Sequence, residues 1–122
     1  MEESQTADLL GKTLTKAVQK GDEEIVFETA DGLRFTYTHH QDCCENVRVE
    51  DVAGDLDDLI GSPLLQAEEV TNADGPEPEY AESYTWTFYK FATIKGSVTI
   101  RWLGESNGYY GESVDLDVEP IQ

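Results

Sequence analysis

The chain is short of basic residues and of long apolar runs, and each shortage excludes a class of function. Of its 122 residues only 8 are lysine or arginine, against 26 aspartates and glutamates, which gives a formal net charge of −18. A surface this negative repels nucleic acid and anionic membranes and attracts basic proteins. The apolar runs are only a few residues long, far below the roughly 18 that a membrane-spanning helix needs. The opening residues, MEESQTADLL, carry no basic region followed by an apolar one, so we expect no secretory signal and a cytoplasmic protein.

The motifs of common enzymes are also missing. The sequence contains no phosphate-binding loop and no GxGxxG, GxSxG or HExxH motif, so nucleotide binding, a nucleophile elbow and a zincin site have no support. The prediction is therefore a protein without catalytic residues. A zinc-dependent hydrolase is the alternative, because residues that can bind a metal are present.

Cysteine is scarce too: the chain has 2, next to each other, and both histidines stand just before them in the segment YTHHQDCCENV. Cysteine, histidine and aspartate are zinc donors when deprotonated. If the flanking strands form a hairpin, residues 41–45 are its loop, and His39 or His40 can approach the cysteines across it. The full CxxC…CxxC zinc signature is absent, because there is no second cysteine pair. A structural zinc site and buried thiols beside satisfied histidines both stay open here, with redox chemistry as a third interpretation.

Alternation of apolar and polar residues predicts β-strands over most of the chain. Phe35 and Tyr37 alternate with threonines in one segment, and Leu116 and Val118 alternate with acidic residues in the last one. Side chains two apart share one face of a strand. These segments are therefore expected to be half-buried strands.

The strongest local signal is the hairpin YTWTFYKFATIKGSVTIRWLGES. Its two long runs are rich in β-branched and aromatic residues, which favour strands. We expect Lys95 and Gly96 to be the two loop residues, a register that places Phe91 opposite Ile100. One face then collects a core-sized cluster, made of Tyr89, Phe91, Val98, Ile100 and Trp102.

One segment, GDLDDLIGSP, departs from the period of a strand. Asp55 is a candidate N-cap, and two more aspartates fall in a first turn where the helix dipole favours negative charge. The whole sequence predicts a mainly β (α+β) fold: a single antiparallel β-sheet domain of about six to eight strands, with one short helix near residues 55–60. The domain is expected to span residues 9–119, after a frayed N-terminus of residues 1–8.

Acidic residues are concentrated in the segment from Asp42 to Glu82, which carries 13 acids and a single base, Arg48. One interpretation is a solvated surface that keeps the protein soluble. The other is mimicry of DNA, in which carboxylates on a rigid surface occupy the lysine and arginine sites of a nucleic-acid-binding protein. On the second interpretation seven acids are the predicted partner-binding residues: Glu50, Asp51, Asp55, Asp57, Asp58, Glu68 and Glu69.

Several motifs together resemble a known family. QDCCE, GDLDDLIGSP, TWTFYKFATIKG and SNGYY, within about residues 9–118, are similar to a family of small acidic proteins encoded by bacteriophages and prophages and carried as a domain of unknown function. The family pattern has one histidine, at the position of His39, so the resemblance favours His39 over His40. The predicted ligands of a structural zinc ion are then His39, Asp42, Cys43 and Cys44.

The resemblance also implies a function. Small acidic phage proteins often inhibit host defences, and anti-CRISPR proteins include strongly acidic and metal-binding members. The expected function is therefore that of an anti-CRISPR-type inhibitor in the cytoplasm of a bacterial host, binding a basic nucleic-acid-binding protein such as a Cas nuclease and blocking its loading. No direct contact with nucleic acid or membrane is expected. A phage structural or assembly protein is a further alternative, in which the acids serve solubility alone.

Overall fold

Eight β-strands dominate the computed structural model of the protein, which describes residues 6–39, 46–72, 83–106 and 114–121. No helix within these ranges is long and apolar enough to cross a membrane. Two 3-10 helices, η1 (Thr6–Leu9) and η2 (Leu56–Leu59), precede β1 and β5. The strands are β1 (Leu14–Lys20), β2 (Glu24–Thr29), β3 (Leu33–Thr38), β4 (Asn46–Ala53), β5 (Gln66–Asn72), β6 (Ser83–Thr93), β7 (Gly96–Ser106) and β8 (Asp115–Pro120).

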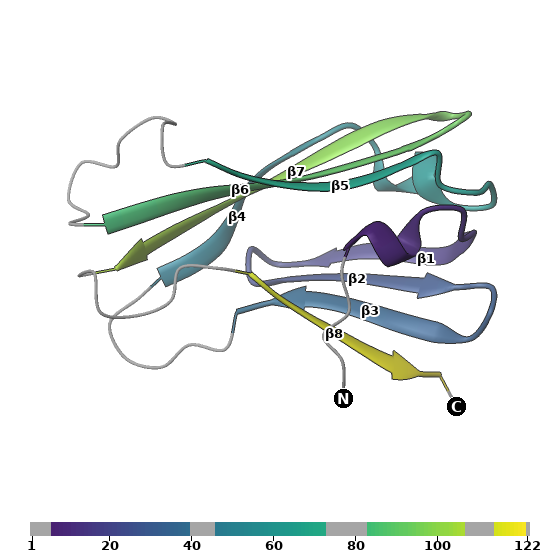
Figure 1. The fold of residues 1–122 in the computed structure, drawn as a ribbon, viewed down its shortest axis with the longest axis horizontal. Helices are drawn as coiled ribbons and strands as arrows, with labels where there is room; N and C mark the ends of the chain where they lie inside the picture. Colours follow the sequence, from purple (N-terminus) through teal and green to yellow (C-terminus); the bar gives the residue numbers. More distant parts are fainter. Residues whose placement is uncertain (1–5, 40–45, 73–82, 107–113, 122) are drawn as a thin grey trace.

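The strands form two four-stranded sheets that lie face to face (Figure 1). One sheet has the order β1-β2-β3-β8 and the other β4-β7-β6-β5, and every pairing is antiparallel. The predicted mainly β fold of six to eight antiparallel strands is confirmed. The strands divide into two sheets because each sheet has one apolar face, which must be buried against another layer.

The two apolar faces meet in one core between the sheets. Phe27 of β2, Tyr37 of β3 and Phe91 of β6 are each no more than 1% exposed. The rings of Phe27 and Phe91 meet edge to face with centroids 5.0 Å apart, and those of Tyr37 and Tyr89 have centroids 4.6 Å apart. Such aromatic pairs stabilise a core by roughly 0.5–1.5 kcal/mol beyond the burial of their area.

The β6–β7 hairpin differs in register from the prediction. Thr93 pairs with Gly96, so the two loop residues are Ile94 and Lys95 and not Lys95 and Gly96. The predicted pairing is wrong by a slip of two residues. Because an even slip leaves every side chain on its original face, the predicted core cluster is nevertheless buried: Tyr89, Phe91, Val98, Ile100 and Trp102.

Contacts with η2 explain this register. The hydroxyl of Thr93 donates to the carbonyl oxygen of Asp58 at 2.5 Å, and the main-chain N–H of Lys95 donates to the Thr93 hydroxyl oxygen at 3.2 Å. Gly96 has no positive φ, but a Cβ at this position would lie 2.9 Å from Oδ2 of Asp58. The glycine therefore permits the close approach of η2, which a local turn pattern cannot reveal.

The short helix expected near residues 55–60 is present as η2. Asp55 is its N-cap, and the Asp55 carboxylate accepts a hydrogen bond from the N–H of Asp57 at 2.9 Å. Near the N-terminus, η1 includes residues 6–8, just ahead of the expected start of the domain at residue 9. η1 starts at Thr6, which is buried and shares a hydrogen bond of 2.9 Å with the hydroxyl of Tyr37.

Candidate partner-binding surface

His39 directly follows β3 and is the one predicted metal ligand within the described ranges. Its side chain is 9% exposed, and Nδ1 lies 3.9 Å from Oδ2 of Asp115 on β8. Asp42, Cys43 and Cys44 lie outside the described residues, and no group of three or more histidines, cysteines or acids among the described ones could hold a metal ion. Zinc binding stays a prediction, which metal analysis of protein purified without chelators can test.

Glu69, one of the predicted partner-binding acids, takes part in a polar contact at the margin of the core. The Tyr89 hydroxyl donates to Oε1 of Glu69 at 3.4 Å. Loss of solvation is the main reason that the pKa values of Tyr37 and Tyr89 are raised, and the negative charge of Glu69 raises both further. Both phenols therefore stay protonated at neutral pH, and Glu69 has a role within the fold.

The structure places the seven predicted partner-binding acids in three parts of the fold: on β4 and on β5, at opposite edges of one sheet, and in the η2 segment beside the β6–β7 turn. Glu50 and Asp51 lie on β4, and the three aspartates of the η2 segment follow them in the chain (Figure 1). Glu68 and Glu69 lie on β5, at the opposite edge of the β4-β7-β6-β5 sheet. Six of the seven acids are exposed and the seventh, Asp58, is half-buried.

The β1–β2 turn adds two acids to the group on β4. The main-chain N–H of Val49 donates to the carbonyl oxygen of Asp22 at 2.6 Å, which holds the turn against β4. Asp22 and Glu23 are both exposed. We call the combined surface the acidic ridge; its members are Asp22, Glu23, Glu50, Asp51, Asp55, Asp57 and Asp58.

Sequence reasoning missed Asp22 and Glu23 because KGDE is, locally, only a hairpin turn. Its position beside β4 depends on how the two sheets pack, and no periodicity records that. An acidic turn directly next to an acidic strand in the sequence would have been a signal, but here β2, β3 and the segment after β3 separate the turn from β4.

A family model described as a domain of unknown function, DUF7448, matches residues 7–116. The chain belongs to the DUF7448 family. The matched range begins in η1 and ends in β8, so it contains every member of the acidic ridge. No curated protein and no solved structure matches the chain.

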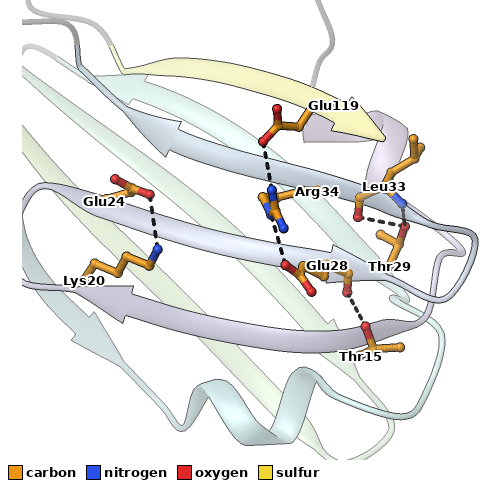
Figure 2. A network of polar contacts seen from close by, with 8 residues as sticks. All are labelled: Thr15, Lys20, Glu24, Glu28, Thr29, Leu33, Arg34 and Glu119. Carbon is orange, nitrogen blue, oxygen red and sulfur yellow. Dashed lines mark hydrogen bonds and ion pairs between the residues drawn. The ribbon is translucent and has the colours of Figure 1, made fainter. Parts of the chain in front are cut away.

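Three of the eight basic residues of this DUF7448 chain line a groove on a different face, whereas Arg48, Lys90 and Arg101 lie on strands of the β4-β7-β6-β5 sheet. All 8 lie within the described residues, and Lys16, Lys20 and Arg34 line a groove of about 770 Å³ on the outer face of the β1-β2-β3-β8 sheet. Arg34 bridges two carboxylates there, with Nε 3.0 Å from Glu28 and Nη1 3.0 Å from Glu119 (Figure 2). Ion pairs therefore compensate much of the charge on this face.

The acidic ridge of the DUF7448 chain keeps most of its negative charge. Arg48, on β4, forms ion pairs with two acids: Nε lies 3.1 Å from Oε2 of Glu50, and Nη2 lies 2.8 Å from Oε1 of Glu105. The five aspartates of the ridge form no ion pair with any residue in the described ranges. The ammonium of Lys95, close to η2, donates to the carbonyl oxygen of Ile60 at 2.8 Å and not to a carboxylate. The ridge thus presents a negative potential to the solvent.

Proposed function

We propose that this DUF7448 chain is a phage-encoded anti-defence inhibitor of the anti-CRISPR type that acts as a DNA mimic. It binds a basic nucleic-acid-binding protein of the bacterial host, such as a Cas nuclease, through the acidic ridge and blocks the loading of nucleic acid. The observation that supports this function best is the set of carboxylates without ion pairs: the five ridge aspartates form none among the described residues, whereas Lys20 and Arg34 on the outer face of the other sheet do. A surface field of one sign steers association with a surface of the opposite sign.

The backbone beneath the ridge is held firmly, and this suits a mimic. β4 is paired with β7 from Asn46 to Ala53, with a shift of register at Glu50, and η2 is capped by Asp55 and bonded to the β6–β7 hairpin through Asp58. Carboxylates on a fixed backbone lose less conformational entropy when they bind. They can then replace phosphates in a site whose lysines and arginines have defined positions.

Charge reversal on the ridge tests the proposal. Asp51→Lys/Asp57→Lys reverses two exposed carboxylates whose side chains make no hydrogen bond to the described residues, so the fold should be retained. In a pull-down from bacterial lysate, we expect the wild type to retain a basic nucleic-acid-binding protein at about 50 mM salt and to release it at about 500 mM, because salt screens exposed charges. The double variant should bind this protein at least about tenfold more weakly.

The matched control carries the same change of charge elsewhere. Glu68→Lys/Asp117→Lys alters exposed acids on β5 and β8 and should bind the partner as the wild type does. Equal loss of binding in the two variants would mean that net charge, and not the ridge, determines binding. If the purified partner binds nucleic acid equally well with and without the protein, the inhibitory function is wrong.

A further inference from the structure

Exposed apolar side chains gather at one end of the sandwich. Within the described ranges four large apolar residues are exposed, and three of them lie at this end: Leu10 at 56%, Leu65 at 62% and Ile94 at 81%. They belong to the segment between η1 and β1, the start of β5 and the β6–β7 turn, which Figure 1 shows together at the end that also carries η2. We call these three residues the end patch. Clustered apolar exposure of this kind marks interaction sites.

Main-chain hydrogen bonds join the three segments that carry the end patch. The N–H of Leu65 donates to the carbonyl oxygen of Ala92, two residues before Ile94, at 2.7 Å. The N–H of Gly11, next to Leu10, donates to the carbonyl oxygen of Leu64 at 2.9 Å. The end patch therefore rests on one continuous, hydrogen-bonded platform.

The turn that carries Ile94 is fixed by hydrogen bonds to the η2 segment. Thr93 and Lys95, its neighbours on either side, are bonded to Asp58 and Ile60 of the η2 segment, the latter through the Lys95 ammonium at 2.8 Å. A side chain that is exposed on a fixed turn loses little backbone entropy when a partner covers it. Ile94 thus has the properties of a preformed anchor, and apolar anchors surrounded by polar residues dominate many interfaces.

The charge around the end patch decides what can cover it. Asp55, Asp57 and Asp58 lie in the η2 segment, and Asp58 contacts the hairpin turn that carries Ile94. Lys95, in the same turn, contributes one positive charge against these three negative ones. A second copy of the chain that docked through this end would bring the two sets of aspartates together, and like charges oppose such an interface. A surface with an apolar face bordered by lysine and arginine complements both features.

We infer that the end patch is the apolar anchor of the interface that the acidic ridge forms, and that its occupant is a basic protein surface with an exposed apolar face. This inference rests on the proposed function. It adds that the partner has an apolar face, which the charges of the acidic ridge alone do not require. Removing the anchor lowers affinity without altering the electrostatic attraction, because Ile94 and Leu65 carry no charge.

Two synthetic helical peptides with the same number of lysines can test the inference. One carries leucines along a single face and the other carries glutamines at those positions. We expect the wild type to bind the leucine peptide at least about tenfold more tightly than the glutamine peptide, since several buried methylene groups account for such a ratio. Fluorescence anisotropy measures both affinities.

Variants assign the preference to the end patch. Ile94→Ser/Leu65→Ser should abolish the preference for leucine, while Val70→Ser, at the fourth exposed apolar residue, should retain it. Ile94, Leu65 and Val70 are all exposed, so circular dichroism should show an unchanged fold in both variants. Absence of the preference in the wild type, or its persistence in the double variant, would overturn the inference.

The same measurement keeps the two proposals apart. Asp51→Lys/Asp57→Lys should weaken both peptides equally and leave their ratio unchanged, because charge cancels in the ratio. If the wild type binds the two peptides equally but charge reversal still weakens the binding of both, the end patch is not an anchor and the role of the acidic ridge is supported. If charge reversal changes neither affinity, the proposed electrostatic function is wrong.

Discussion

Tyr37 and Tyr89 are buried in the core, and the hydroxyl of each forms a hydrogen bond to a polar side chain. Burial raises the pKa of both phenols, and the nearby carboxylate of Glu69 raises it further. In an unfolded chain tyrosine titrates near pH 10. Above that pH the unfolded chain binds fewer protons than the folded one, so the stability of the fold falls as the pH rises.

We therefore expect the free energy of unfolding to begin to fall near pH 10, with a slope that approaches about 1.4 kcal/mol per pH unit for each of these two tyrosines near pH 11. Urea denaturation between about pH 8 and pH 11 measures this slope. Tyr37→Phe should reduce the slope by the contribution of one tyrosine. An unchanged slope in this variant would show that Tyr37 titrates normally in the folded protein.

For single residues, burial could be predicted from the sequence, but contacts between residues far apart in the chain could not. The burial of Phe35 and Tyr37 follows from their alternation with threonines, which the structure confirms. The 3.9 Å separation between His39 and Asp115 does not follow, because the two residues are far apart in the chain and meet only through the pairing of β3 with β8.

At the scale of elements, strand faces and the pairing of β6 with β7 were predictable from the sequence. The hairpin considered for the strands on either side of residues 41–45 is wrong, because β3 and β4 belong to different sheets. The core cluster on β6 and β7 is correct although the register slipped by two, since the period of a strand survives an even slip. Gly96 favours a turn at Lys95 and Gly96, and this local signal led to the predicted loop. The hydrogen bonds to the η2 segment, which place the turn at Ile94 and Lys95, have no local signal in the sequence.

Gly54, between β4 and η2, shows a second such tertiary constraint. Its φ is +110°, and a Cβ there would collide with the carbonyl oxygen of Ser97 near the start of β7. Gly54→Ala should lower the free energy of unfolding by about 2–4 kcal/mol, through backbone strain and displacement of β7. Gly21→Ala is the matched control: φ is +62° but nothing lies within 4 Å of the added Cβ, so a loss of about 1 kcal/mol is expected.

Urea denaturation of the two glycine variants gives the comparison. Equal losses would mean that the positive φ alone matters and that Ser97 moves freely. A larger loss at Gly54 would confirm that the segment leading into the acidic ridge is packed against β7.

At the scale of the whole molecule, composition predicted an excess of negative charge but not its distribution. The net charge of −18 follows from counting residues. The acidic ridge and the ion-paired groove arise from the order of strands in two sheets, which sequence periodicity does not specify. For the same reason Glu68 and Glu69 were grouped with two acids on β4, at the other edge of their sheet, and with three in the η2 segment.

This net charge also makes a prediction about stability. Mutual repulsion opposes the compact state, so the free energy of unfolding should rise as salt increases from about 10 mM to 100 mM, while the screening length falls from about 30 Å to 10 Å. Asp51→Lys/Asp57→Lys changes the charge by +4, from −18 to −14, and should depend less on salt. A decrease in stability with salt would instead show that ion pairs such as that of Arg34 dominate.

The hydrogen bond from Val49 to Asp22 joins the two sheets at the acidic ridge. The ridge is therefore a composite epitope, to which one sheet contributes the β1–β2 turn and the other contributes β4. A partner that spans it acts as a clamp across the sandwich, and saturation at about 100 times the dissociation constant would add about 2.7 kcal/mol to stability. Binding and folding of this protein are thus thermodynamically linked, and a chain with separated sheets has no ridge to recognise.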